Sequence, residues 1–140
     1  MSVFIVDASV AAKWFFKEDN GEEALSILDE SNQLHAPDFL LLEMDSIILK
    51  WVRRGAVGPQ EGIDIRDALR RYPVQHHPFT SFLDDAFTIA SQTGQSIYDC
   101  LYVALAAVLH GRMVTADRRL YDAMKGGPFR KYVVWVGDIE

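Results

Sequence analysis

The segment GQSIYDCLYVALAAVLHGRMVTAD, residues 94–117, decides the fold of this chain. Residues 97–109 are apolar with one charged interruption, Asp99, and this pattern predicts a buried helix that ends before Gly111. Residues 113–115 are a short apolar run that predicts a strand. A helix of more than about ten residues that leads into a short strand is typical of the βαβ units of parallel sheets.

The rest of the chain repeats this alternation of short apolar runs with longer helical patterns. Further strands are predicted over residues 3–6, 34–36, 74–76 and 132–136. Further helices are predicted over residues 8–16, 22–28, 39–54, 59–71, 80–93 and 118–125, with Thr80 as a cap. We therefore predict a single α/β domain over residues 1–140, with a central parallel sheet of about five short strands and helices on both sides.

Composition indicates an ordinary globular protein. The chain has 140 residues, of which 49% are hydrophobic and 24% charged, enough for a substantial core. No apolar run approaches the roughly 18–20 residues that span a bilayer, and no basic leader precedes the apolar start of the chain. The single cysteine, Cys100, cannot form an internal disulfide. These features favour a cytoplasmic protein.

The net charge of −6 argues mildly against a strong general affinity for nucleic acid. The basic residues are nevertheless grouped locally, and groups of this kind are candidates for contacts to a phosphate backbone. The three groups are Lys50, Arg53 and Arg54; Arg66, Arg70 and Arg71; and Arg112, Arg118 and Arg119.

Four acidic residues are predicted to meet at one edge of the sheet. Asp7 directly follows the first strand, and Asp117 follows the strand over residues 113–115. Asp99 begins the helix that leads into that strand, and Glu43 lies in the first turns of an apolar helix. Open parallel sheets bind ligands at the carboxyl ends of their strands, which is the edge that all four share.

A cluster of carboxylates without a cation is unfavourable, because each charge raises the pKa values of the others. Mg²⁺ and Mn²⁺ favour oxygen ligands and would reverse that effect. One or two such ions could activate a water molecule and stabilise the departing oxygen of a phosphodiester. The hydroxyls of Ser9 and Thr115, each two residues from an acid, could orient ligands or water.

Each acid also has a structural interpretation that remains open at this point. Asp7 and Asp117 could cap the helices that follow them, Asp99 could complete a capping box with Ser96, and Glu43 could face water.

The sequence motifs of other common catalytic and metal sites are missing. The sequence has no GxxxxGK[ST] loop, no GxGxxG after a strand and no GxSxG elbow, and its single cysteine argues against a structural zinc site.

Four segments together resemble a PIN domain, and more closely the VapC-type ribonuclease toxins of bacterial and archaeal toxin–antitoxin pairs. They are FIVDASVAAKWF (4–15), APDFLLLEMDSIILKWVRRG (36–55), SIYDCLYVALA (96–106) and MVTADRRL (113–120), and they cover most of the chain in order. The resemblance implies an endoribonuclease that depends on Mg²⁺ or Mn²⁺. It carries over the site as Asp7, Glu43, Asp99 and Asp117, with Ser9 and Thr115 as the accompanying hydroxyls.

The resemblance also implies a homodimer that a cognate antitoxin holds inactive, an RNA substrate and no membrane association. One position departs from the family pattern. Many relatives carry Asn three residues after the helix Glu, and Ser46 stands there in this chain. Its hydroxyl can still form a hydrogen bond, but its side chain reaches less far toward the site than Asn does. An alternative is a PIN-like scaffold with weak or no catalysis that binds RNA or a protein.

Overall fold

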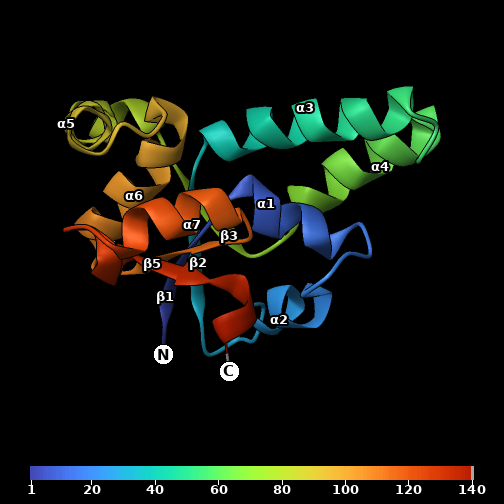
Figure 1. Ribbon diagram of the computed structural model, residues 1–140. Coiled ribbons are helices and arrows are strands. Elements are labelled where there is room, and N and C mark those ends of the chain that lie inside the picture. Colours follow the sequence, from blue (N-terminus) through green and yellow to red (C-terminus); the bar gives the residue numbers. More distant parts are fainter. Residues whose placement is uncertain (140) are drawn as a thin grey trace.

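A central sheet of parallel strands organises the molecule (Figure 1). The structure, a computed structural model, describes residues 1–139. The five strands are β1 (Val3–Val6), β2 (Gln33–Pro37), β3 (Val74–His77), β4 (Arg112–Thr115) and β5 (Val133–Trp135). Their order in the sheet is β3-β2-β1-β4-β5, and every neighbouring pair is parallel. The predicted fold class is therefore confirmed.

The central strand β1 is covered on both faces. Phe4, Ile5 and Val6 point alternately to the two faces of the sheet, yet each is at most 4% exposed. A continuous apolar run without alternation is the pattern expected of a parallel strand between two helical layers. Because both faces of β1 are buried, helices must cover the sheet on both sides.

The helices within residues 1–139 connect successive strands. They are α1 (Ala8–Ala11), α2 (Gly21–Ser26), α3 (Phe39–Arg53), α4 (Pro59–Leu69), α5 (Leu83–Thr93), α6 (Ile97–Leu109) and α7 (Arg118–Lys125). Helices α3 and α4 contact each other and form an arm at one end of the molecule in Figure 1. None of these helices is long and apolar enough to cross a membrane.

Several predicted elements have different bounds in the structure, and three of the differences are described here. The predicted helix 8–16 is a short α-helix followed by a 3₁₀ turn, in which Trp14 donates a hydrogen bond to the Ala24 carbonyl. Thr80 does not cap α5 but lies within a 3₁₀ turn over Phe79–Phe82 that precedes it. The last strand is shorter than predicted and does not include Tyr132.

Helix α6 is the main support of the sheet. Seven of its residues are buried, and it contacts β1, β2 and β4. Ser96 caps its start, and His110 ends it in the left-handed conformation, at φ 54°. Gly111 follows, where a Cβ atom would lie 2.6 Å from the Val3 carbonyl oxygen, so only glycine fits this close approach. The helix that carries Asp99 is therefore fixed rigidly against the sheet.

Candidate functional site

The order of the strands brings Asp7 and Asp117 to the same point of the sheet. The chain builds outward from β1 to β2 and β3, then returns to place β4 on the other side of β1. In the β1–β4 pair, Val6 lies beside Val114, so Asp7 and Asp117 follow adjacent strand ends. A reversal of strand order of this kind opens a crevice at the carboxyl edge, where α/β proteins bind ligands.

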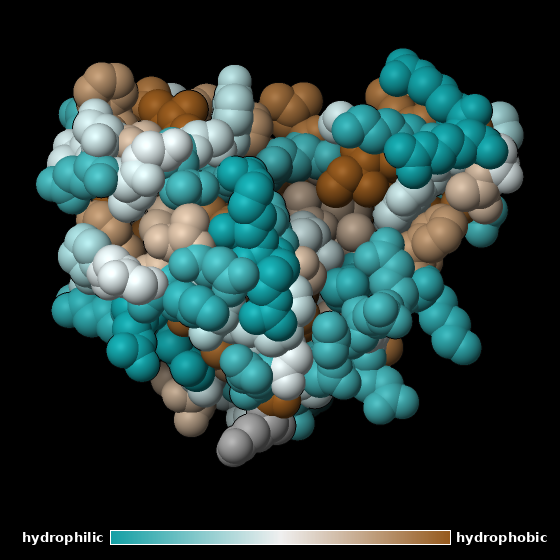
Figure 2. All heavy atoms as spheres, in the orientation of Figure 1, coloured by the Kyte–Doolittle hydropathy of each residue, from teal (hydrophilic) through white to brown (hydrophobic). Residues whose placement is uncertain are grey.

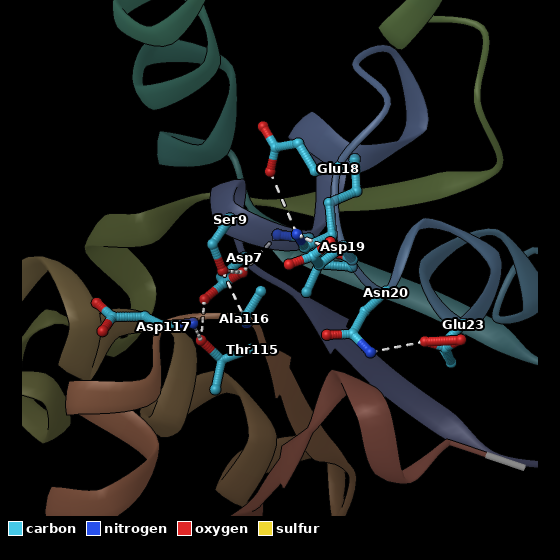
Figure 3. A network of polar contacts seen from close by, with 11 residues as sticks. Asp7, Ser9, Glu18, Asp19, Asn20, Glu23, Thr115, Ala116 and Asp117 are labelled. Atoms are coloured by element: carbon cyan, nitrogen blue, oxygen red, sulfur yellow. Dashed lines mark hydrogen bonds and ion pairs between the residues drawn. The ribbon is translucent and has the colours of Figure 1, made fainter.

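Asp7 is buried, at 6% exposure, and held by three hydrogen bonds (Figure 3). Its Oδ1 atom accepts from the Ser9 hydroxyl at 2.6 Å and from the backbone N–H of Val10 at 3.0 Å. Its Oδ2 atom accepts from the Thr115 hydroxyl at 2.6 Å. The bond from Val10 makes Asp7 the N-cap of α1, which confirms the capping interpretation, while its role in a functional site stays a prediction.

The two hydroxyls that hold Asp7 also position the chain around Asp117. The N–H of Ala116 donates to Ser9 Oγ at 2.9 Å, and the N–H of Asp117 donates to Thr115 Oγ1 at 3.1 Å. Asp117 Oδ1 in turn accepts from the Leu120 N–H at 3.2 Å, which makes Asp117 the N-cap of α7. Ser9 and Thr115 therefore connect the Asp7 carboxylate to the main chain at Ala116 and Asp117.

Glu43 and Asp99 reach the site from two different helices. Glu43 lies in the second turn of α3, and its Oε1 atom accepts a hydrogen bond from the hydroxyl of Tyr102 on α6. Asp99 lies in the first turn of α6, where its backbone N–H donates to Ser96 Oγ at 3.1 Å. This cap uses the main chain of Asp99.

Burial and neighbouring acids raise the pKa values of Asp7, Glu43 and Asp99. Burial raises the pKa of Asp7 to about 6, against the hydrogen bonds from Ser9, Thr115 and Val10, and the charge of Asp99 raises it further. Burial likewise raises the pKa of Glu43 to about 7; the bond from Tyr102 lowers it, and Asp7 and Asp99 raise it. Burial is the main cause of both shifts, and the neighbouring negative charges add to it.

Asp99 connects this group to the last acid. Burial raises its pKa, the Ser96 side chain lowers it, and the charge of Asp117 raises it. The guanidinium of Arg119 opposes these effects and lowers the pKa of Asp99. Asp99 therefore links Asp117, whose charge acts on it, with Asp7 and Glu43, on which it acts, and the role of the four acids as one site stays a prediction.

The donor atoms fit a hard divalent cation, because they are carboxylate and hydroxyl oxygens without sulfur. Within residues 1–139, however, no three His, Cys, Asp or Glu side chains already form a ligand cage. Both oxygens of Asp7 accept hydrogen bonds, and the Asp117 carboxylate points away from Asp7 (Figure 3). An ion held by both aspartates would require the Asp117 carboxylate to turn toward Asp7, while each Asp7 oxygen can bind an ion and keep its hydrogen bond.

A family model described as PIN domain matches residues 4–126. The chain belongs to the PIN domain family. This PIN domain is 31% identical to Ribonuclease VapC3 of Pyrobaculum aerophilum over 120 residues, 84% of this chain and 92% of that protein. It is 28% identical to VapC ribonuclease Mb0985 of Mycobacterium bovis over 120 residues, 86% of this chain and 90% of that protein.

Solved structures share the fold of this PIN domain. The crystal structure of PAE2754 from Pyrobaculum aerophilum matches with a TM-score of 0.69 at 21% identity, covering 97% of this chain and 85% of that one. The structure of VapBC2 from Rickettsia felis, bound to a DNA fragment from its promoter, matches with a TM-score of 0.64 at 15% identity. That match covers 95% of this chain and 98% of the other.

Two sequence expectations for this PIN domain look different in the structure. Ser46 lies one turn beyond Glu43 on α3 and is exposed. The hydrogen bonds found within residues 1–139 do not join it to the site, so its supporting role stays a prediction.

The basic group of Arg112, Arg118 and Arg119 does not lie at one place in the structure. Arg112 begins β4 at the opposite edge, over the ring of Phe4, because residues at the two ends of a strand face different edges.

Two residues of the site were missed by sequence reasoning. Tyr102 was counted among the apolar positions of its helix, although its spacing of three residues from Asp99 places both on one face. Arg119 was assigned only to a general basic group, whereas its charge acts on Asp99. The spacing of Tyr102 from Asp99 can be seen in the sequence. The effect of Arg119 on Asp99 depends on where α7 lies in the structure.

Proposed function

We propose that this PIN domain is a metal-dependent endoribonuclease and the toxin component of a type II toxin–antitoxin pair. The observation that carries the proposal is the buried Asp7 carboxylate, fixed between Ser9 and Thr115, which shares an electrostatic environment with Asp99 and Glu43. The relatives named VapC ribonucleases, which align over most of their length, support the same activity.

In this proposal Asp7, Glu43, Asp99 and Asp117 hold Mg²⁺ or Mn²⁺. When bound, the ion would activate a water molecule and stabilise the departing oxygen of an RNA phosphodiester. Ser9 and Thr115 keep the Asp7 carboxylate in one orientation, and α6 keeps Asp99 at a fixed place on the sheet. The acids are arranged by rigid elements, and such preorganisation is what an ion site in a nuclease requires.

The proposed RNA contact beside the acids is Arg119. Its guanidinium is the positive group that lowers the pKa of Asp99, and a cation beside a proposed ion ligand is a candidate for contact with an RNA phosphate. Arg66 is a weaker candidate than the sequence suggested, because it is paired with both oxygens of Asp45, at 2.7 and 2.9 Å. The basic groups predicted from sequence therefore do not contribute equally in this proposal.

We also propose an antitoxin protein and a second copy of the chain as partners, and a location in the cytoplasm, where RNA is available. Exposed apolar side chains support protein partners. Figure 2 shows hydrophobic surface over the α3–α4 arm, where Leu49 and Ile63 are 49% and 48% exposed. Phe87 on α5 and Val108 on α6 are 66% and 53% exposed. Isolated exposed apolar residues are common, but these lie on successive helices.

An RNA cleavage assay with antitoxin-free protein tests the activity. Wild type and Asp7→Asn are compared in EDTA, Mg²⁺ and Mn²⁺. Cleavage that needs the ion and disappears in the variant supports the nuclease, whereas equal cleavage by both proteins indicates a contaminant. Absence of cleavage by wild type, together with no thermal stabilisation by millimolar Mn²⁺, would favour the catalytically weak scaffold that binds RNA or protein.

A further inference from the structure

A buried tyrosine on α6 lies at the acidic edge. We use this name for the carboxyl edge of the sheet with its four acids, Asp7, Glu43, Asp99 and Asp117. Tyr102 is 1% exposed, and its hydroxyl donates a hydrogen bond to Oε1 of Glu43, which lies 59 residues earlier in the chain. A buried phenol needs a partner for its hydroxyl, and Glu43 supplies it here. Tyr102 follows Asp99 by three residues, so one face of α6 carries both an acid of the site and the donor to a second acid.

Glu43 depends on such a donor more than the other acids do. Asp7 is held by three hydrogen bonds and Asp117 by the first turn of α7. Glu43 has the longer side chain, and the hydrogen bond found for it among residues 1–139 is the one from Tyr102. A flexible carboxylate loses conformational freedom when it binds an ion, and a rigid donor removes part of that loss in advance.

The tyrosine is well suited to hold a carboxylate. Helix α6 fixes it against β1, β2 and β4, so the hydroxyl has little freedom to move. It engages Oε1 of Glu43 and leaves Oε2 available. Because a phenol is neutral, it orients the carboxylate without placing a positive charge in competition with a cation. The hydrogen bond also joins α3 to α6, the two helices that bring Glu43 and Asp99 to the site.

We propose that Tyr102 is a positioning residue that orients Glu43 for cation binding at the acidic edge. The inference rests on the proposed metal site and adds a residue to it. It acts through Glu43 alone, which gives it a distinct experimental signature. Groups that orient metal ligands typically change affinity about 10–100-fold when they are removed.

The test is a double-mutant cycle on Mn²⁺ binding, measured by titration calorimetry without RNA. Tyr102→Phe removes only the hydroxyl and is expected to weaken Mn²⁺ binding by about 10-fold or more. In a Glu43→Gln background the same substitution is expected to change binding by less than about twofold, because the acceptor has lost its charge. Tyr72→Phe, which alters a tyrosine stacked on Trp14, is the matched control and should bind Mn²⁺ as wild type does.

Three results would contradict the inference. Unchanged Mn²⁺ affinity in Tyr102→Phe would show that the hydroxyl does not position Glu43. An equal loss of affinity in both backgrounds would show that it acts through the fold. Absence of Mn²⁺ binding by wild type would remove the proposed metal site and the inference together, so the two failures can be distinguished. Circular dichroism and thermal unfolding in EDTA establish that each variant is folded before titration.

A kinetic measurement distinguishes a defect in positioning Glu43 from a general loss of activity in Tyr102→Phe. If Tyr102 orients a ligand of the ion, Tyr102→Phe cleaves RNA slowly at low Mn²⁺ and recovers at saturating Mn²⁺, with the KM for RNA unchanged. A rate that remains low at saturating Mn²⁺, or a raised KM for RNA, would oppose the inference.

Discussion

The hydroxyl of Thr115 donates a hydrogen bond of 2.6 Å to Oδ2 of Asp7, although 108 positions separate the two residues in the chain. The same oxygen of Thr115 accepts from the backbone N–H of Asp117 at 3.1 Å. A single fully buried hydroxyl therefore connects the acid that ends β1 to the acid that follows β4. The arrangement makes the geometry of the acidic edge depend on the pairing of these two strands.

Replacing Thr115 with Val should weaken metal binding without unfolding the protein. The substitution keeps the β-branched shape but leaves Asp7 Oδ2 and the Asp117 N–H without this partner, so we expect about a 10-fold loss in Mn²⁺ affinity. Thr115→Ser keeps the hydroxyl and should bind Mn²⁺ within about threefold of wild type. Calorimetric titration compares the three proteins, and equal affinity of Thr115→Val and wild type for Mn²⁺ would exclude this role.

Asp7→Asn should stabilise the metal-free protein at alkaline pH. The folded pKa of Asp7, about 6, lies above its unfolded value near 3.8, so the folded state binds the proton more tightly and loses stability as pH rises from about 4 to about 6. That difference corresponds to at most about 3 kcal/mol, and weaker hydrogen bonds to Asn reduce it to about 1–2 kcal/mol.

Urea unfolding in EDTA measures this gain. The variant should exceed wild type in free energy of unfolding near pH 8 and lose its advantage near pH 4. Added Mn²⁺ should then stabilise wild type but not the variant, since the ion binds only the folded wild-type site. A variant that is less stable than wild type at both pH values would mean that the hydrogen bonds of the carboxylate outweigh its burial.

The affinity for Mn²⁺ should rise with pH. Asp7 and Glu43, with pKa values of about 6 and about 7, are mostly protonated near pH 5.5 and must lose their protons before they bind an ion. We expect affinity to increase by about 10-fold or more between about pH 5.5 and pH 7.5, then level off. In Glu43→Gln the increase in Mn²⁺ affinity should be smaller, and its midpoint should lie at a lower pH, near the pKa of Asp7. A flat profile in wild type would rule out these carboxylates as ligands.

Asp99→Asn should abolish RNA cleavage and leave the fold intact. The helix cap uses the backbone N–H of Asp99 and the hydroxyl of Ser96, neither of which the substitution changes. We therefore expect a circular dichroism spectrum like that of wild type and a loss of at least about 100-fold in cleavage rate. Ser96→Ala is the converse control, which should lower stability by about 1 kcal/mol while cleavage persists. Wild-type turnover by Asp99→Asn would count decisively against the site.

Arg119→Gln should weaken RNA binding in a salt-dependent way. If the guanidinium contacts a phosphate beside Asp99, its loss reduces the slope of log affinity against log salt by about 1. Arg112→Gln removes an equal charge at the opposite edge of the sheet and should leave the slope unchanged. Fluorescence anisotropy with a short RNA, at several salt concentrations, compares the two. Identical slopes for both variants would place the RNA elsewhere.

Local patterns predicted the elements well where local forces dominate. Helix α7 has the predicted bounds, Arg118–Lys125, because Asp117 caps it and its apolar residues fall on one face. The prediction failed at residues 12–16, where Trp14 and Phe15 pack on Tyr72, and at Thr80, where the N–H of Phe79 bonds to Asp38. Contacts with residues distant in sequence decided the backbone at both places.

The sequence by itself determined the fold class and the positions of the four acids relative to their own strands and helices. Apolar runs and helical spacing report local burial, and an acid directly after a strand must lie at its carboxyl end. The tertiary structure decided that β1 lies beside β4, and therefore that Thr115 reaches Asp7. It likewise decided that Tyr102 reaches Glu43. Which strands and helices become neighbours depends on packing across the whole chain, and periodicity within one segment carries no information about it.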